Sequence, residues 1–272
     1  SRPLLLSVRS GAAISMPGMM ITFLNVGINE EIVAGLIQET GEPWFAWDCY
    51  RRFLQSWGMS FDIERDVFDA IMHAYKARYH RMLKREFSTE EIREVVRGYR
   101  QTLEERGVSV PDNPDEQLQI AIYQVMRSWY SQKARKYREI MGISDDWGTA
   151  VTVQAMIYGN LDTDSGSGVA FTHNPKSTDD RISLWGDFTL GNQGEDVVGG
   201  LVQTLPLSEE QRQENGRQET TSFESLFPQL FARLNEIVEK LIYEQGWGPQ
   251  EIEFTIQSDT EEGLFILQSR DM

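Results

Sequence analysis

The last twenty or so residues constrain the fold of this chain more strongly than any other stretch. Residues 251–257 and 264–270 are two runs rich in β-branched and aromatic side chains, and the polar segment 258–263 between them supplies a turn. This pattern predicts a β-hairpin. Because side chains alternate between the faces of a strand, the first run has an apolar face and a polar face, and the polar face carries Glu251 and Glu253.

These two carboxylates have the chemistry of a magnesium site. Residues two apart on a strand lie about 6.5–7 Å apart, and Mg²⁺ takes oxygen ligands, usually from one or two carboxylates together with substrate phosphates. Gln268 and Arg270 alternate in the same way on the return strand, where an amide and a cation could bind phosphate oxygens. The alternative is a surface hairpin with a solvated polar face, which is favoured for an acidic alternating strand taken alone. Other parts of the chain have to show which of these two interpretations is correct.

Length, charge and cysteine content exclude several classes of protein. The chain has 272 residues, enough for more than one ordinary domain. Its formal charge of −16 argues against non-specific binding to nucleic acids or anionic membranes, and no apolar run approaches the ~20 residues of a membrane span. Cys49 is the only cysteine, so no internal disulfide is possible, and a reducing, cytoplasmic location is expected. The histidines are well separated and form no convincing zinc site.

The segment 29–112 is helical in pattern. Apolar residues recur in it at intervals of three or four, which predicts amphipathic helices over 29–39, 44–57, 63–84 and 90–106. We interpret this segment as a helical insert with solvated charged faces. A further long helix is expected over 116–141.

Strand patterns lie on both sides of these helices. We expect strands at 4–9, 149–158, 168–172 and 182–188. The second of them has the sequence of a buried strand. Farther on, the polar segment 208–221 indicates a mobile loop, and 223–245 indicates a final helix.

Three loops combine glycines with residues that could bind a ligand. Arg9 ends the first strand, and the glycines of the loop that follows, 10–20, let the backbone approach a ligand closely. The loop 159–168 has a Ser-Gly-Ser-Gly tip that can turn backbone N–H groups onto an anion. Glu195 lies among the glycines of 191–200. Each loop equally suits an ordinary turn, so each is a weak signal by itself.

Seven stretches taken together resemble the nucleotide-binding domain of pyruvate phosphate dikinase. They are Ser7–Ala12, Ser15–Met20, Asp146–Val151, Ser165–Thr172, Gln193–Val198, Glu253–Gln257 and Leu267–Arg270. They occur in the order of that domain and span essentially the whole chain, so the set is highly specific although each member is weak. The run Ser-Met-Pro-Gly-Met-Met favours the dikinase over its relative phosphoenolpyruvate synthase.

The resemblance implies an α+β chain with the ATP-grasp fold, in which ATP lies in a cleft between two α+β portions. Residues 1–28 and 113–157 are then expected to be the remainder of an incomplete first lobe, 29–112 a helical insert subdomain, and 158–272 the second lobe with the metal-binding hairpin. The resemblance also implies Mg²⁺ as cofactor and ATP as substrate. In the family, Mg-ATP phosphorylates a histidine on a separate swivelling domain, and that histidine later delivers the phosphoryl group to pyruvate on a barrel domain. A homodimeric parent protein is expected.

Site residues are carried over from the resemblance position by position. It places Arg9, Gly18 and Met20 near the phosphates, Gln154 beside the adenine, Ser167 and Gly168 at the tip of the phosphate loop, Glu195 on the ribose side, Glu251 and Glu253 on the metal, and Gln268 and Arg270 on the phosphates. Arg9 and Arg270 are the expected catalytic residues, because phosphoryl transfer requires cations and Mg²⁺ to offset charge.

The sequence departs from the family pattern at four positions. Glu251 stands where the family usually has Asp, Ser167 where it has Thr, Ile21 where it has Asp, and His173 where it has Arg. The chain opens at a strand, without the family's phosphate-contacting lysine, and has no glycine-rich segment with the acceptor histidine. We therefore expect an excised fragment that is inactive alone. The alternatives are a domain of phosphoenolpyruvate synthase or a related dikinase, and a stand-alone, non-catalytic nucleotide-binding module.

Overall fold

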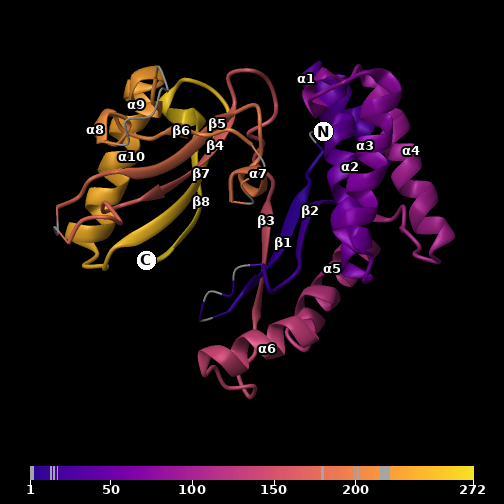
Figure 1. Ribbon diagram of the computed structural model, residues 1–272, viewed down its shortest axis with the longest axis horizontal. Coiled ribbons are helices and arrows are strands. Elements are labelled where there is room, and N and C mark those ends of the chain that lie inside the picture. Colours follow the sequence, from indigo (N-terminus) through magenta and orange to yellow (C-terminus); the bar gives the residue numbers. More distant parts are fainter. Residues whose placement is uncertain are drawn as a thin grey trace. The chain divides into compact units, whose positions relative to one another are not determined.

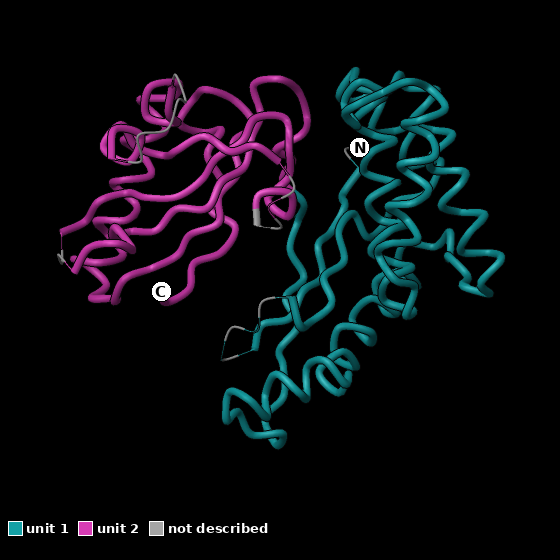
Figure 2. The backbone as a smooth tube through the Cα atoms, in the orientation of Figure 1, with its two compact units in different colours: residues 1–156 teal, residues 157–272 magenta. Residues whose placement is uncertain are grey.

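The computed structural model describes residues 3–12, 14, 16, 18–178, 181–198, 200, 202–214 and 221–272. The backbone forms two compact units, unit 1 with residues 1–156 and unit 2 with residues 157–272 (Figure 2). Each unit combines helices with an antiparallel sheet, which fits the predicted α+β class. No helix in the described ranges combines the length and the apolar character that a membrane crossing requires.

Unit 1 contains a sheet of three antiparallel strands in the order β2-β1-β3 (Figure 1). Its strands are β1 Leu6–Gly11, β2 Thr22–Val26 and β3 Ala150–Ala155. The expectation that the last of these is buried is wrong, because β3 lies at the edge of the sheet beside β1, and Val153 is 43% exposed. The apolar run in β3 therefore does not mark a core strand.

The predicted amphipathic helices are present in unit 1. They are α1 Glu30–Thr40, α2 Pro43–Ser60, α3 Arg65–Tyr79 and α4 Thr89–Glu105. α3 ends earlier than predicted, because His80 adopts the left-handed conformation with φ +55°, and a short 3₁₀ turn, η1 Lys84–Glu86, follows. α2 packs against β2, where the rings of Phe23 and Trp57 lie 5.7 Å apart.

The long helix expected over 116–141 is wrong, because the chain forms two helices there. They are α5 Pro114–Ser128 and α6 Gln132–Met141. Ser131 has an extended backbone, and its Oγ accepts a hydrogen bond from the Ala134 N–H at 3.2 Å. Since this is the geometry of an N-cap, Ser131 starts a new helix and does not continue the old one. α5 packs against all three strands of the sheet.

Unit 2 contains a five-stranded antiparallel sheet in the order β6-β5-β4-β7-β8 (Figure 1). The strands are β4 Gly166–Phe171, β5 Trp185–Leu190, β6 Leu205–Pro206, β7 Gln250–Ile256 and β8 Leu264–Asp271. The predicted terminal hairpin is confirmed as the pair β7–β8, whose connection includes the short 3₁₀ turn η3 Glu261–Gly263.

The helices of unit 2 are shorter than the sequence pattern indicates. They are α7 Gly194–Val198, α8 Glu209–Glu214, α9 Phe223–Leu226, α10 Pro228–Glu239 and the π-helical turn η2 Lys240–Glu244. The single final helix over 223–245 is interrupted at Phe227, since the residue before a proline is disfavoured in the helical conformation. The expected loop 208–221 begins as α8, and its residues 215–220 lie outside the described residues.

One face of the unit 2 sheet carries the core of that unit. Ile252, Phe254 and Ile256 of β7 are at most 1% exposed and form one cluster with Phe188 of β5 and apolar residues of α9 and α10. This cluster leaves the opposite face of the same strands free for polar side chains, and the candidate site lies there.

Candidate functional site

The hairpin β7–β8 pairs the four residues that were predicted to form its polar face. Glu251 lies opposite Arg270, and Glu253 lies opposite Gln268. Directly opposed residues in an antiparallel pair project from the same face of the sheet, and the intervening Ile252 is buried on the other face. The alternation predicted from the sequence is therefore confirmed. The pairing shifts after Glu253, where a bulge or irregularity interrupts it.

The polar face continues across the two strands beside the hairpin. Val169 of β4 pairs with Glu253 of β7 on one side and with Asp187 of β5 on the other. Asp187 is therefore a second acid in the same cross-strand row as Glu253. Asp187 accepts a hydrogen bond from the Thr204 hydroxyl at 2.8 Å. Sequence reasoning missed Asp187, although an acid within a largely apolar strand could have indicated it. Beside this row, the hydroxyls of Ser167 and Thr255 lie 3.1 Å apart.

Glu251 and Arg270 form an ion pair across the hairpin. Their side chains are 17% and 28% exposed, so the pair is largely shielded from water without being fully buried. The hydrogen bond to Glu251 raises the pKa of the Arg270 guanidinium further above its ordinary value, and the charge of Glu253 adds to this effect. The arginine is therefore a permanent cation on this face.

The donor set of the polar face suits a magnesium ion that shares its ligands with a substrate. Within the described residues, no group of three or more acidic, histidine or cysteine side chains is arranged to hold a metal ion. Two carboxylates, Glu251 and Glu253, with the Gln268 amide beside them, do not make a closed protein cage. Mg²⁺ commonly needs only one or two protein carboxylates, because phosphates and water complete its octahedral shell. The residues present fit that incomplete kind of site.

The placement of Ser167 and Gly168 at a loop tip is wrong. Both lie inside strand β4 and are buried. Their side chains belong to opposite faces, since Ser167 meets Thr255 on the polar face whereas a Cβ at Gly168 would lie 2.5 Å from the ring of Phe254 in the core. Gly168 thus makes room for a phenyl ring.

The turn that precedes β4 is organised by a different residue. Asp162 accepts hydrogen bonds from the backbone N–H groups of Asp164, at 2.9 Å, and Ser165, at 2.8 Å. These bonds hold residues 162–165 in a closed turn. A Cβ at Gly159 would lie 2.1 Å from the Ser167 hydroxyl, so this glycine lets the chain pass close to β4.

Glu195 is exposed on the short helix α7, which packs against β4, β5 and β7. Its neighbour Asp196 is buried and accepts a hydrogen bond from the Gln193 N–H at 3.3 Å. The Gln193 amide donates to Asn160 at 3.0 Å, whereas its oxygen is buried without a hydrogen-bond partner. Of the two adjacent acids, Asp196 therefore holds the turn and Glu195 is left accessible.

In unit 1, two of the predicted site residues lie in contact. Arg9 of β1 donates a hydrogen bond to the Oε1 of Gln154 of β3 at 2.6 Å. Gly18 is exposed with φ +68° in the turn that follows β1, a conformation that favours glycine. Met20 packs with Trp129, which lies at the end of α5, and with Ile143, which lies just after the end of α6. The loop is thus attached to these helices by an apolar contact.

The sheet of unit 2 therefore has a helix-covered apolar face and a polar face with three acids, a cation and an amide, the groups that bind a metal ion and a phosphorylated ligand together. The comparison with protein families agrees with this class of site. Residues 1–212 match the family described as pyruvate phosphate dikinase, AMP/ATP-binding domain. The chain belongs to this family.

Curated relatives carry the name of the same enzyme. The chain is 42% identical over 273 residues to pyruvate, phosphate dikinase of Rhizobium meliloti (strain 1021), covering 99% of this chain and 30% of that protein. It is 44% identical over 211 residues to the enzyme of Giardia intestinalis, covering 77% of this chain and 24% of that protein. Pyruvate, phosphate dikinase 2 of Oryza sativa subsp. japonica is 41% identical over 271 residues, which are 99% of this chain and 28% of that protein. The chain thus spans less than a third of the length of these relatives.

Proposed function

We propose that this chain is the ATP-binding part of a pyruvate phosphate dikinase, and that the polar face of β7–β8 binds the phosphates of Mg-ATP. The observation that carries the proposal is the register of the hairpin, which sets Glu251 against Arg270 and Glu253 against Gln268 on the face opposite the core. The relatives reported above are all named as dikinases, and this favours the dikinase over phosphoenolpyruvate synthase.

Each residue of the polar face has a separate role in this proposal. Glu251 and Glu253 hold Mg²⁺, Gln268 donates its amide to a phosphate oxygen, and Arg270 offsets phosphate charge. Mg²⁺, when bound, stabilises the charge that develops on the transferred phosphoryl group. Because Arg270 is paired with Glu251 before any ligand binds, its guanidinium is already oriented, and less side-chain entropy is lost on binding.

The remaining nucleotide contacts in this proposal follow from the resemblance. We assign the exposed carboxylate of Glu195 to the ribose, and Arg9, Gly18 and Met20 to the phosphates. The contact between Arg9 and Gln154 supports a shared role, since the amide fixes the guanidinium. Ser167, although it lies within β4, still presents its hydroxyl on the polar face.

The longer protein is proposed to transfer the phosphoryl group from ATP to a histidine on another domain and from there to pyruvate on a barrel domain. An ATP-grasp fold, a homodimer and a cytoplasmic location are parts of the same proposal. They rest on membership of the family.

Calorimetric titration with a non-hydrolysable ATP analogue, with and without Mg²⁺, tests the site. The wild-type chain should bind the analogue more tightly when Mg²⁺ is present. Glu253→Gln should remove most of that gain, since it deletes one of the two proposed carboxylate ligands. Glu262→Gln is a matched control, because Glu262 is an exposed acid in the turn of the same hairpin. If Glu253→Gln keeps the full Mg²⁺-dependent gain, the proposed metal site is wrong.

A further inference from the structure

Unit 1 contains a buried arginine that the proposed nucleotide contacts do not use. Arg138 of α6 is 1% exposed, and a buried charge lowers stability unless it is paired and hydrogen-bonded. Its Nε and Nη2 donate to Oδ1 of Asp145 at 2.9 and 2.6 Å. The Asp145 side chain, however, is 71% exposed, and an ion pair with a well-solvated partner contributes little to stability. The ion pair by itself therefore does not explain why Arg138 is buried.

Two other contacts of Arg138 are made with Trp129, at the end of α5. Nη1 donates to the Trp129 carbonyl oxygen at 2.7 Å, and the guanidinium carbon lies 4.1 Å from the centroid of the indole ring. This distance is within the range of cation–π interactions. The indole N–H is buried and has no hydrogen-bond partner among the described residues, so no hydrogen bond of its own orients the ring. Arg138 thus holds both the backbone and the ring of Trp129.

Trp129 in turn supports the loop that follows β1. It forms one apolar cluster with Met16 and Ile143, and Met19 and Met20 pack against this cluster. Trp129 is 2% exposed and Met16 is 7% exposed, so the contact between helix and loop is buried. Methionine side chains are flexible and fill irregular gaps. The rigid indole ring therefore sets the surface on which the methionines of the loop pack.

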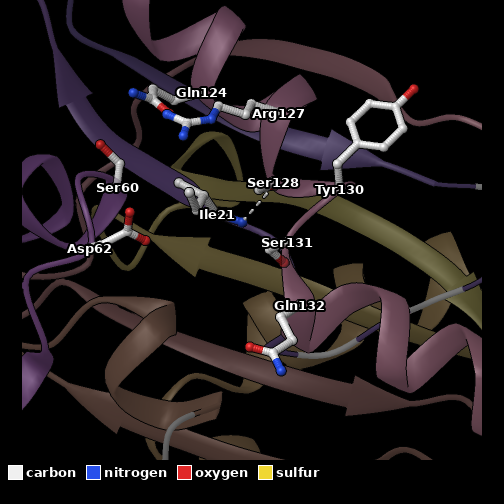
Figure 3. Close-up of a pocket in the computed structure, with 9 residues that line it drawn as sticks. All are labelled: Ile21, Ser60, Asp62, Gln124, Arg127, Ser128, Tyr130, Ser131 and Gln132. Carbon is white, nitrogen blue, oxygen red and sulfur yellow. Dashed lines mark hydrogen bonds between the residues drawn. The ribbon is translucent and has the colours of Figure 1, made fainter.

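The backbone of the same loop is held at the end of α5. The Met19 N–H donates to the Met16 carbonyl oxygen at 3.1 Å, which closes a turn that includes Gly18. The Ile21 N–H donates to the hydroxyl of Ser128, the last residue of α5, at 3.3 Å (Figure 3). The loop is therefore attached on both sides of Gly18, while Gly18 itself is exposed.

We propose that Trp129, held by Arg138, is the positioning residue of this loop and orders it for contact with the nucleotide phosphates. This inference rests on the proposed function, which assigns Gly18 and Met20 of the loop to the phosphates. A loop that is ordered before the ligand arrives loses less conformational entropy on binding. Without the contact between Arg138 and Trp129 the loop samples more conformations, so the affinity for phosphate groups falls while contacts to the base and the ribose stay the same.

Methyl NMR of the ligand-free chain tests the contact between Arg138 and Trp129. The ring current of the indole should displace the methyl signals of Met16 and Met20 from the position of a free methionine. Arg138→Leu should return both signals at least halfway to that position, because the ring and the loop become mobile. Arg138→Lys should shift them in the same direction, since an ammonium group lacks the planar fork that serves Asp145 and the carbonyl oxygen together.

Titration with two ligands tests the effect on binding. Arg138→Leu should weaken binding of the non-hydrolysable ATP analogue, with Mg²⁺, about tenfold, and should change binding of adenosine, which has no phosphates, by less than about twofold. Each variant is measured at a temperature at which it is folded, so that a lower stability alone does not change the measured affinity. If Arg138→Leu does not fold, Arg138→Lys is judged by the same criteria.

Arg93→Leu is the matched control for both measurements. Arg93 of α4 also lies over an indole ring, that of Trp47, with its guanidinium carbon 5.1 Å from the ring centroid. Neither residue belongs to the cluster that supports the loop. The control should therefore leave the methyl signals of Met16 and Met20 and both affinities unchanged.

Three results would overturn the proposal. They are unchanged methyl signals in Arg138→Leu, unchanged affinity of this variant for the ATP analogue, and equal weakening of the ATP analogue and adenosine, which would make Arg138 a purely structural residue. Either of the last two would leave the proposed function standing. A wild-type chain that does not bind the ATP analogue would contradict the proposed function itself, and with it the phosphate role of the loop.

Discussion

Replacement of Gly168 with alanine tests whether this glycine serves the core or a ligand. A Cβ at this position would lie 2.5 and 2.7 Å from two ring atoms of Phe254 and 2.9 Å from the carbonyl oxygen of Asp187. The ring cannot easily move away, because Phe254 stacks on Phe188 with centroids 6.3 Å apart and also contacts Phe223. The backbone carbonyl of β5 is fixed by the sheet.

The cost of this change follows from the overlap. An extra methyl group in a well-packed core usually costs about 1–3 kcal/mol. Alanine also reduces the freedom of the unfolded chain, which returns about 0.4–1 kcal/mol. We therefore expect Gly168→Ala to lower the free energy of unfolding by about 1–2 kcal/mol, or the melting temperature by about 2–8 °C.

Thermal and urea denaturation of four variants, Gly168→Ala, Gly194→Ala, Phe254→Leu and the Phe254→Leu/Gly168→Ala double variant, separates the two roles of Gly168. Gly194→Ala in the same unit is the control, since no atom lies within 4 Å of the added Cβ, and its free energy of unfolding should rise by about 0.4–1 kcal/mol from the reduced freedom of the unfolded chain. In a Phe254→Leu background, Gly168→Ala should cost less than in the wild type, because the overlapping ring is gone. If Gly168→Ala keeps wild-type stability but loses binding of the ATP analogue, the packing explanation is refuted.

Three further changes test other parts of the structure. Asp48→Asn should lower the free energy of unfolding by about 3–5 kcal/mol in urea denaturation, since it leaves the buried Arg51 without its charge partner; a loss below about 1 kcal/mol would contradict this. Hydrogen bonds from two serines and an arginine lower the pKa of Glu209 to about 2, so the contribution of this carboxylate to stability should be complete above about pH 4.5 and disappear as the pH falls toward 2. Glu209→Gln should therefore flatten the curve of unfolding free energy against pH between about 2 and 4.5. Parallel curves for the wild type and the variant would contradict this assignment. Ile252→Asp should unfold unit 2 by burying a charge, whereas Glu253→Gln should leave the melting temperature almost unchanged; a large drop for Glu253→Gln would make that carboxylate a structural partner.

The features that the sequence predicts best are those that depend on a short repeat. The hairpin β7–β8 follows from period-two alternation, which a strand with one buried face must keep, and the same rule assigns Glu253 and Ile252 to opposite faces. The amphipathic helices of unit 1 follow from a period near 3.6 in the same way. In both cases the signal lies within one element, so no knowledge of its neighbours is needed.

The features that the sequence misses depend on contacts between elements. The core beneath β4 requires a small residue at Gly168, and this requirement comes from Phe254, more than eighty positions farther along the chain. The break between α5 and α6 is set by a cap at Ser131, whose serine resembles many others in the chain. Asp187 joins the polar face only because β5 pairs with β4 in a particular register.

The ion pair between Glu251 and Arg270 explains how the hairpin can carry two carboxylates on one face before any ligand binds. Like charges about 7 Å apart on a strand destabilise the folded state. Arg270 neutralises one of them within the hairpin itself, and Glu251 in turn raises the pKa of Arg270, so the cation persists at any ordinary pH. The hairpin therefore does not need a metal ion to fold. Since Glu251 is already paired with Arg270, an incoming metal ion competes with Arg270 for the Glu251 carboxylate. The phosphates that would accompany the ion are negatively charged, as Glu251 is, and give Arg270 an alternative partner.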